Sequence, residues 1–115
     1  MTACYIFLFF ISVENSEDCL TLNVFVPTTI KPDEKIAVMV WIHGGGFSFG
    51  SGWAFPGGVL AAFNDVIVVS INYRLGVLGF LNVPGTDVTG NFGMLDQVRI
   101  FQTISLCNVL KFFIG

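Results

Sequence analysis

The 115-residue sequence has few charged side chains, which make up only 11% of it, whereas hydrophobic residues make up 54%. Five basic residues against eight acidic ones give a net charge of −3. The chain therefore lacks the basic surface that binding to nucleic acid requires. Its mean hydropathy of +0.79 is high for a free-standing soluble domain. We expect its surfaces to need packing partners that lie elsewhere.

Histidine is scarcer still, because His43 is the only one. No second histidine or cysteine stands at metal-ligand spacing from it, so the sequence predicts no metal site. The three cysteines, Cys4, Cys19 and Cys107, cannot all pair within one chain. We expect Cys19 to be a free thiol.

Residues 1–15 form an apolar N-terminal segment whose hydrophobic core is about ten residues long. That length suits a signal-peptide core but is too short to span a bilayer. A basic start and a small-residue cleavage site are both missing. Two interpretations stay open, a degenerate secretory signal and a buried or translated non-coding segment, and we predict no firm membrane span.

Residues 38–52, VMVWIHGGGFSFGSG, are the stretch around which the chain is organised. Residues 38–42 are apolar and β-favouring, which predicts a buried strand. The glycines that follow His43 predict a loop whose backbone can approach a ligand closely. Consecutive amides at Gly44, Gly45 and Gly46 can then point to one spot and stabilise a developing negative charge. This is the arrangement of an oxyanion hole.

Two further strands are predicted around this loop. Residues 20–26 alternate between apolar and mixed side chains, and the short polar link 28–35 predicts an antiparallel pair with residues 37–42. Residues 66–71 are continuously apolar, as in a strand covered on both faces. A helix over residues 59–64 between the second and third strands predicts a parallel crossover. With so few helices, the sheet should leave large apolar surfaces exposed.

Less order is predicted towards the C-terminus. Residues 72–90 are expected to form a long loop. Asn91 is expected to cap a helix that begins near Gly93, with Asp96 in its first turn. Beyond Val98 the apolar residues show no clear helical period.

Four motifs in register carry a resemblance to a known family. They are SEDCLTLNV at 16–24, VWIHGGGF at 40–47, NYRLG at 72–76 and GNFGMLDQ at 90–97. Together they resemble the type-B carboxylesterase and cholinesterase family, over about residues 16–98. The resemblance implies an α/β fold, namely the N-terminal strands of a mixed, mostly parallel α/β-hydrolase sheet with a glycine-rich oxyanion loop. Residues 16–98 would then be a partial carboxylesterase domain, and residues 99–115 a divergent C-terminal tail.

The resemblance also implies roles for individual residues. Gly45 and Gly46 would contribute half of the oxyanion hole, while His43 and Gly44 would shape the loop. Glu17 and Arg74 would form a structural ion pair. No cofactor is implied, and the substrate of full-length relatives would be a small carboxylic ester.

The residues of a catalytic triad are not recognisable in the sequence. Hydrolases of this fold need a serine on a strand-to-helix elbow, then an acid, then a histidine. The pattern Gly-x-Ser-x-Gly does occur around Ser48, but glycines and a proline follow where the elbow needs a helix. His43 precedes Ser48 and belongs to the glycine loop, so we interpret Ser48 as a chance match and assign no catalytic residue.

The sequence therefore predicts part of a serine esterase that retains half an oxyanion hole and is inactive alone. One alternative is a non-catalytic adhesion or interaction domain, which the same family includes. Another is a truncated product without independent function. The family resemblance favours a secreted or lumenal location, and the sequence makes no prediction of oligomeric state.

Overall fold

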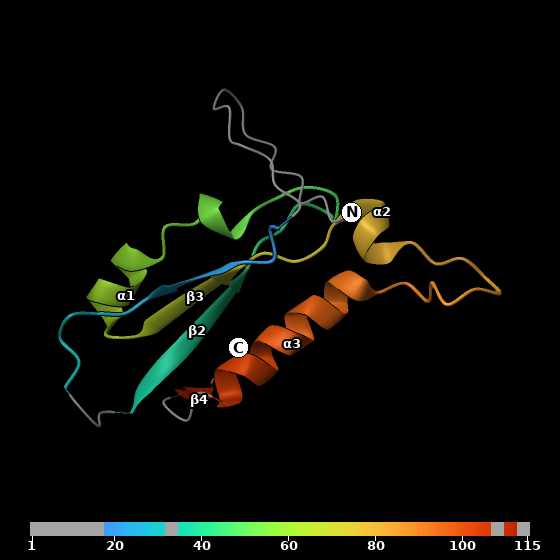
Figure 1. The fold of residues 1–115 in the computed structure, drawn as a ribbon. Helices are drawn as coiled ribbons and strands as arrows, with labels where there is room; N and C mark the ends of the chain where they lie inside the picture. The colour runs from blue at the N-terminus through green and yellow to red at the C-terminus, as the bar shows by residue number, and fades with distance from the viewer. Residues whose placement is uncertain (1–17, 32–34, 107–109, 113–115) are drawn as a thin grey trace.

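The computed structural model describes residues 18–31, 35–106 and 110–112, which form a mixed sheet flanked by helices (Figure 1). The predicted α/β fold is confirmed. The strands are β1 (Leu22–Phe25), β2 (Ile36–Ile42), β3 (Ile67–Ile71) and β4 (Leu110–Phe112). The helices are the 3-10 turn η1 (Gly52–Ala54) and the α-helices α1 (Gly58–Asn64), α2 (Gly76–Phe80) and α3 (Phe92–Leu106).

Strand β3 lies inside the sheet, whose order is β1-β3-β2-β4. All five of its residues are buried, as expected for a run of isoleucine and valine, interrupted only by Ser70, with cover on both faces. It runs parallel to β2, with Val69 opposite Val40, so the predicted crossover through α1 is confirmed. Strand β1 pairs antiparallel with β3. The expected pairing of β1 with β2 is therefore wrong, because the more apolar β3 takes the place between them.

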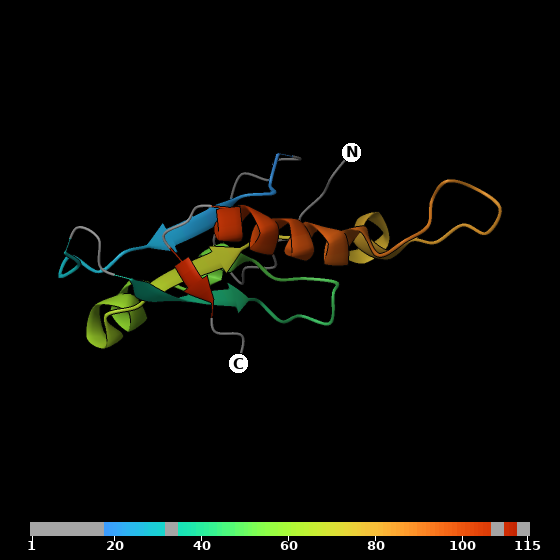
Figure 2. The same cartoon turned by 90° about the horizontal axis from the view of Figure 1, so that it is seen from below.

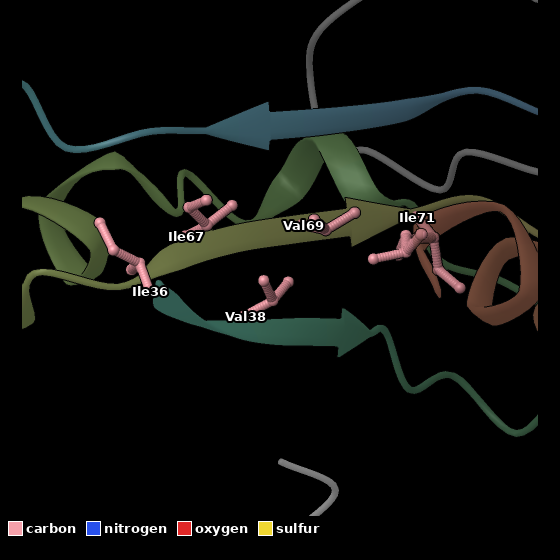
Figure 3. Packing of buried hydrophobic residues seen from close by; sticks show 6 residues of the cluster. Ile36, Val38, Ile67, Val69 and Ile71 are labelled. Carbon is pink, nitrogen blue, oxygen red and sulfur yellow. The ribbon is translucent and has the colours of Figure 1, made fainter. Parts of the chain in front are cut away.

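Helix α3 covers one face of this sheet. The buried cluster on that face combines alternate residues of β2 and β3 with Ile104 of α3, and Ile100 packs against it. Figure 3 shows the strand members of this cluster, which are Ile36, Val38, Ile67, Val69 and Ile71. The period of two along each strand directs these side chains to the same side.

The opposite face is covered by η1 and α1, so the strands lie between α1 and α3 (Figure 1). Gly57, just before α1, sits so close to Val68 and Phe25 that a β-carbon there would meet both side chains. Ala61 is the buried residue of α1. Figure 2 shows the same arrangement from below, with α3 running along the sheet.

The C-terminal half is more ordered than the sequence predicted. The expected loop 72–90 contains helix α2 and a bridge between Asn82 and Thr89. Helix α3 continues past Val98 to Leu106, and β4 then pairs with Ile36–Val38. Packing of Ile100 and Ile104 on the sheet stabilises the helix despite its weak period. Within the described ranges, the sheet thus has four strands.

Some of the predictions concern residues outside the described ranges, namely residues 1–15, Cys4, Glu17 and Cys107. Cys19 is disulfide-bonded, which corrects the expected free thiol; its partner is not among the described residues. Within the described ranges, no helix is long and apolar enough to cross a bilayer.

Large apolar surfaces remain exposed, as the sequence predicted. The more exposed side chains come from β1 and the residue after it, the end of β2, the glycine loop and all four helices, and include Val26, Trp41, Phe49, Trp53, Phe63, Val77 and Leu95. Strand β4 pairs with only the first part of β2. Isolated apolar residues are common on protein surfaces, but so many on one small domain indicate packing partners.

Ile71 and Ile42 provide a matched test of this core, since they stand opposite each other in β3 and β2. Ile71 is fully buried whereas Ile42 is 37% exposed. We expect Ile71→Val to lower the free energy of unfolding by about 1 kcal/mol. Ile42→Val should lower it by less than about 0.5 kcal/mol. Urea denaturation followed by circular dichroism measures both, and equal losses would contradict the packing described.

Candidate functional site

The glycine loop that follows β2 folds into a tight turn. Gly45, Gly46 and Phe47 all have positive φ angles, of 120°, 58° and 58°. The Gly45 carbonyl oxygen accepts hydrogen bonds from the amides of Ser48 and Phe49, at 3.1 and 3.2 Å. A β-carbon on Gly45 would overlap the Phe49 carbonyl, so only glycine fits there. The loop thus uses its own carbonyl groups to close the turn.

The amides of Gly45 and Gly46 remain free of such bonds. Within the described part of the chain, no oxygen accepts a hydrogen bond from either amide. Unpaired backbone N–H groups on a positive-φ turn are the donors from which oxyanion holes are built. The geometry therefore fits the role predicted for these two glycines, which stays a prediction.

His43 lies beneath the loop and is 7% exposed. Its Nδ1 atom lies 2.8 Å from the Gly44 carbonyl oxygen, to which it can donate a hydrogen bond. The imidazole ring stacks on Tyr73, with 4.6 Å between ring centroids. Gly50 lies so close to the Nδ1 and Cε1 atoms of the ring that a β-carbon there would overlap them. This packing fits a residue that shapes the loop.

The residues directly after β3 tie the loop to the rest of the sheet. The Tyr73 hydroxyl donates to the His43 carbonyl oxygen at 3.0 Å. Burial raises the pKa of Tyr73, so the phenol stays protonated and able to donate. The Gly76 amide donates to the Phe47 carbonyl oxygen at 2.6 Å. Because parallel β2 and β3 end at the same edge, the two loops meet and hold each other.

Asn72 makes a second set of links from the same segment. Its Oδ1 accepts a hydrogen bond from the Gly52 amide at 2.8 Å, and its Nδ2 donates to the Cys19 carbonyl oxygen at 3.0 Å and to Thr21 Oγ1 at 3.2 Å. The far end of the glycine loop and the start of β1 are thereby fixed to the end of β3.

Arg74 forms a bidentate ion pair with Asp96 of α3. Its Nε and Nη2 atoms each lie 2.7 Å from a carboxylate oxygen, and its backbone amide donates to the same carboxylate at 3.1 Å. Hydrogen bonding to Asp96 raises the pKa of Arg74, which outweighs the lowering by burial. The stability that this shift contributes is fully present below the pKa that Arg74 has in the unfolded chain. It is lost only as the pH rises through the higher pKa of Arg74 in the folded chain, in strong alkali.

This pairing corrects the expected role of Asp96 and leaves that of Glu17 untested. Asp96 does not lie in the first turn of α3, which contains no acidic residue. Its charge interacts with Arg74 instead of with the start of the helix. The partner predicted for Arg74, Glu17, lies outside the described residues, so that pair stays a prediction.

A pocket of about 280 Å³ opens between the loop and the first turns of α3. Its lining residues come from the end of β2, the glycine loop, the end of β3 and α3, and are Ile42, His43, Gly44, Gly46, Phe47, Tyr73, Met94 and Gln97. Gln97 is 8% exposed and makes no hydrogen bond within the described ranges. Gly46 therefore lines a mainly apolar cavity whose polar side chains are those of His43, Tyr73 and Gln97.

Ser48 shows no feature of an activated nucleophile. Its hydroxyl donates to the Gly46 carbonyl oxygen at 3.2 Å, and the residue is exposed. The chain stays in turns up to η1, so no helix follows Ser48 as an elbow requires. In the described part of the chain, no three histidine, cysteine or carboxylate side chains gather as a metal site would need.

Comparison with known proteins identifies the family of this fold. The family model for "Carboxylesterase family" matches residues 5–105, which is most of the chain. The chain belongs to the carboxylesterase family. The match extends beyond both ends of the segment 16–98 in which the motifs were recognised.

Individual members of the carboxylesterase family agree with this assignment. A cocaine esterase from Oryctolagus cuniculus is 52% identical over 93 residues, covering 81% of this chain and 18% of the relative. Neuroligin-2 from Mus musculus is 45% identical over 109 residues, covering 78% of this chain and 13% of the relative. A solved PNB esterase is 43% identical with a TM-score of 0.74, covering 87% of this chain and 22% of that structure. The chain thus spans about a fifth of such relatives.

Sequence reasoning located the glycine loop but missed most of what holds it. Tyr73 and Gly76 follow β3 in the NYRLG motif, in which the sequence predicts a structural role for Arg74 alone. Gln97 was noted as part of a motif and not as a pocket residue. The parallel pairing of β2 and β3 was the available signal, since it brings both loops to one edge.

Asp96→Asn tests the ion pair, because it removes the charge while keeping the side-chain size. We expect the free energy of unfolding to fall by about 1–3 kcal/mol, since Arg74 loses charged hydrogen bonds in a half-buried setting. Asp87→Asn in an exposed loop is the control and should cost less than about 0.5 kcal/mol. Urea denaturation compares the two, and a harmless Asp96→Asn would refute the role given to the pair.

Proposed function

We propose that this chain is the oxyanion-loop segment of a carboxylic-ester hydrolase of the carboxylesterase family. Gly45 and Gly46 supply two backbone donors for the oxygen of a tetrahedral intermediate. The acyl group would be bound to a serine on a strand-to-helix elbow. No serine on such an elbow is recognisable in this sequence. Alone, the 115 residues are inactive.

One observation carries this proposal. The carbonyl groups of the loop are occupied, that of Gly45 by Ser48 and Phe49 and that of Phe47 by Gly76, whereas the Gly45 and Gly46 amides are unpaired in the described structure. Gly46 is exposed and Gly45 is half-buried, so both amides are accessible to a ligand. Fixed donors stabilise a developing charge without reorganising, which is how such loops accelerate acyl transfer.

The non-catalytic interaction domain remains the second candidate. Neuroligin-2, whose name describes no hydrolase, is also a relative at 45% identity, and apolar side chains are widely exposed. The intact glycine loop favours the enzyme segment, because an interaction surface gains nothing from unpaired amides in a pocket.

The isolated chain should not hydrolyse esters. A lone serine hydroxyl bound to a carbonyl oxygen has no base to deprotonate it, so no acyl-enzyme forms. We expect p-nitrophenyl acetate to be hydrolysed by the purified chain no faster than by its Ser48→Ala variant. Turnover that disappears in Ser48→Ala but survives in Ser105→Ala, another exposed serine, would overturn the proposal.

A chimera tests whether the loop is competent in a complete active site. Residues 20–98 of this chain would replace the matching segment of PNB esterase, which retains its own triad. We expect the chimera to hydrolyse p-nitrophenyl acetate. Gly45→Ala should lower its kcat by about 10²–10³-fold, because a β-carbon displaces the donors.

Gly58→Ala is the matched control for the chimera. A β-carbon at Gly58 meets only ordinary contact with Phe25, so activity should stay within about threefold of the unsubstituted chimera. A Gly45→Ala chimera as active as the Gly58→Ala chimera would contradict the role of the loop.

A further inference from the structure

Strand β1 forms an open edge of the sheet. It stands at the end of the strand order and, among the described residues, pairs only with β3. The Asn72 amide donates to the Thr21 carbonyl oxygen at 3.0 Å, which fixes the alternation of this antiparallel ladder. The backbone groups of Thr21 and of every second residue after it therefore face β3. Those of Leu22 and Val24 point outwards, where no described residue bonds to them.

The same edge carries a row of exposed apolar side chains. Its members alternate along the strand and are 49%, 39%, 53% and 56% exposed, in the order Leu20, Leu22, Val24 and Val26. We call these four residues the β1 stripe. Leu22 and Val24 stand opposite Ile71 and Val69, so the stripe lies on the face of the sheet that carries α3.

The edge lacks the features that usually prevent a strand from pairing with another chain. Edge strands are commonly protected by charged side chains or by proline. Residues 20–26 contain neither, and Pro27 comes only after the stripe has ended. An open edge of this kind pairs readily with an added strand. Because it is uncharged, it favours an uncharged strand over an acidic or a basic one.

The sequence of β1 is complementary to itself in one antiparallel register. The outward backbone groups of Leu22 in one copy pair with those of Val24 in the other when the twofold axis passes through Asn23. Leu20 then stands opposite Val26, so every member of the β1 stripe meets another member. Aliphatic pairs of this kind stabilise a sheet, and a surface that matches itself gives a closed dimer.

We infer that the 115-residue chain forms a dimer in which two β1 edges pair antiparallel about Asn23. The two sheets then continue into each other through their β1 strands. The inference is independent of the proposed function, because β1 lies outside the glycine loop.

The size of this surface sets the strength of the dimer. The β1 stripe offers apolar area on the order of 300 Å² in each copy, whereas a standard interface buries about 800 Å² per partner. The outward backbone hydrogen bonds at Leu22 and Val24 add to that contact. The dimer is therefore weak, and its population depends on protein concentration.

Sedimentation equilibrium over a series of concentrations tests the inference. We expect the mean mass to rise from 12.6 kDa towards twice that value and to stop there. Val24→Lys places one lysine of each copy close to the axis and should weaken the dimer at least about tenfold.

Val98→Lys is the matched control, since Val98 is 49% exposed and belongs to α3. It follows Met94 by one helical turn, and Met94 lines the pocket beside Ile42 of β2. This side of α3 therefore faces away from β1, and the control should dimerise like the unsubstituted chain.

Hydrogen exchange of the unsubstituted chain tests the register without any substitution, so it still decides the matter if Val24→Lys does not fold. The Leu22 and Val24 amides should exchange freely in dilute solution and become protected as the dimer forms. The Asn23 amide, which faces β3, should be protected at every concentration.

Four results would overturn the inference. The first is a mass that stays at one chain throughout the series, and the second is association that continues past two copies. The third is equal weakening by Val24→Lys and Val98→Lys, which would place the contact on another surface. The fourth is protection of Leu22 and Val24 that is independent of concentration, because the edge would then be covered within a single chain.

Discussion

The structure depends on two parallel strands that end together. Strand β3 is buried along its whole length and holds β2 in parallel register, with Ile71 opposite Ile42 at the carboxyl ends. The loops that leave these ends must therefore lie side by side. The hydrogen bond of 2.6 Å from the Gly76 amide to the Phe47 carbonyl oxygen joins them. The glycine loop is thus positioned by the core and not by its own sequence alone.

This arrangement explains why a loop so rich in glycine can hold a defined shape. Flexible residues are needed for the positive φ angles, but flexibility alone would leave the amides pointing in many directions. Tyr73 anchors the start of the loop, Gly76 its middle and Asn72 its far end. Arg74 secures the same segment to α3 through Asp96. Four links from residues 72–76 thus hold the loop in the shape that the proposed pair of donors requires.

Much of this could be predicted from local patterns in the sequence. The apolar run of β3, the strand before the glycines and the short helix α1 each carry a clear signal, and the motifs indicated the family that comparison confirmed. Long-range pairings were harder to predict. Strand β1 pairs with β3 across some 47 residues, as between Asn23 and Ser70, and no local pattern encodes that choice. The apolar residues of helix α3 show no clear helical period, so the sequence alone did not predict the length of this helix. Its stability comes from packing on the sheet.

The state of the Gly45 and Gly46 amides is the claim on which the functional account rests, and native-state hydrogen exchange measures it directly. The account predicts that both amides exchange within about tenfold of the rate in an unstructured peptide, because no acceptor protects them. The Gly76 amide, which donates to Phe47, should exchange at least about a hundredfold more slowly. Protection of Gly45 and Gly46 equal to that of Gly76 would contradict the account, since those amides would then be engaged within the chain and unable to receive an oxyanion.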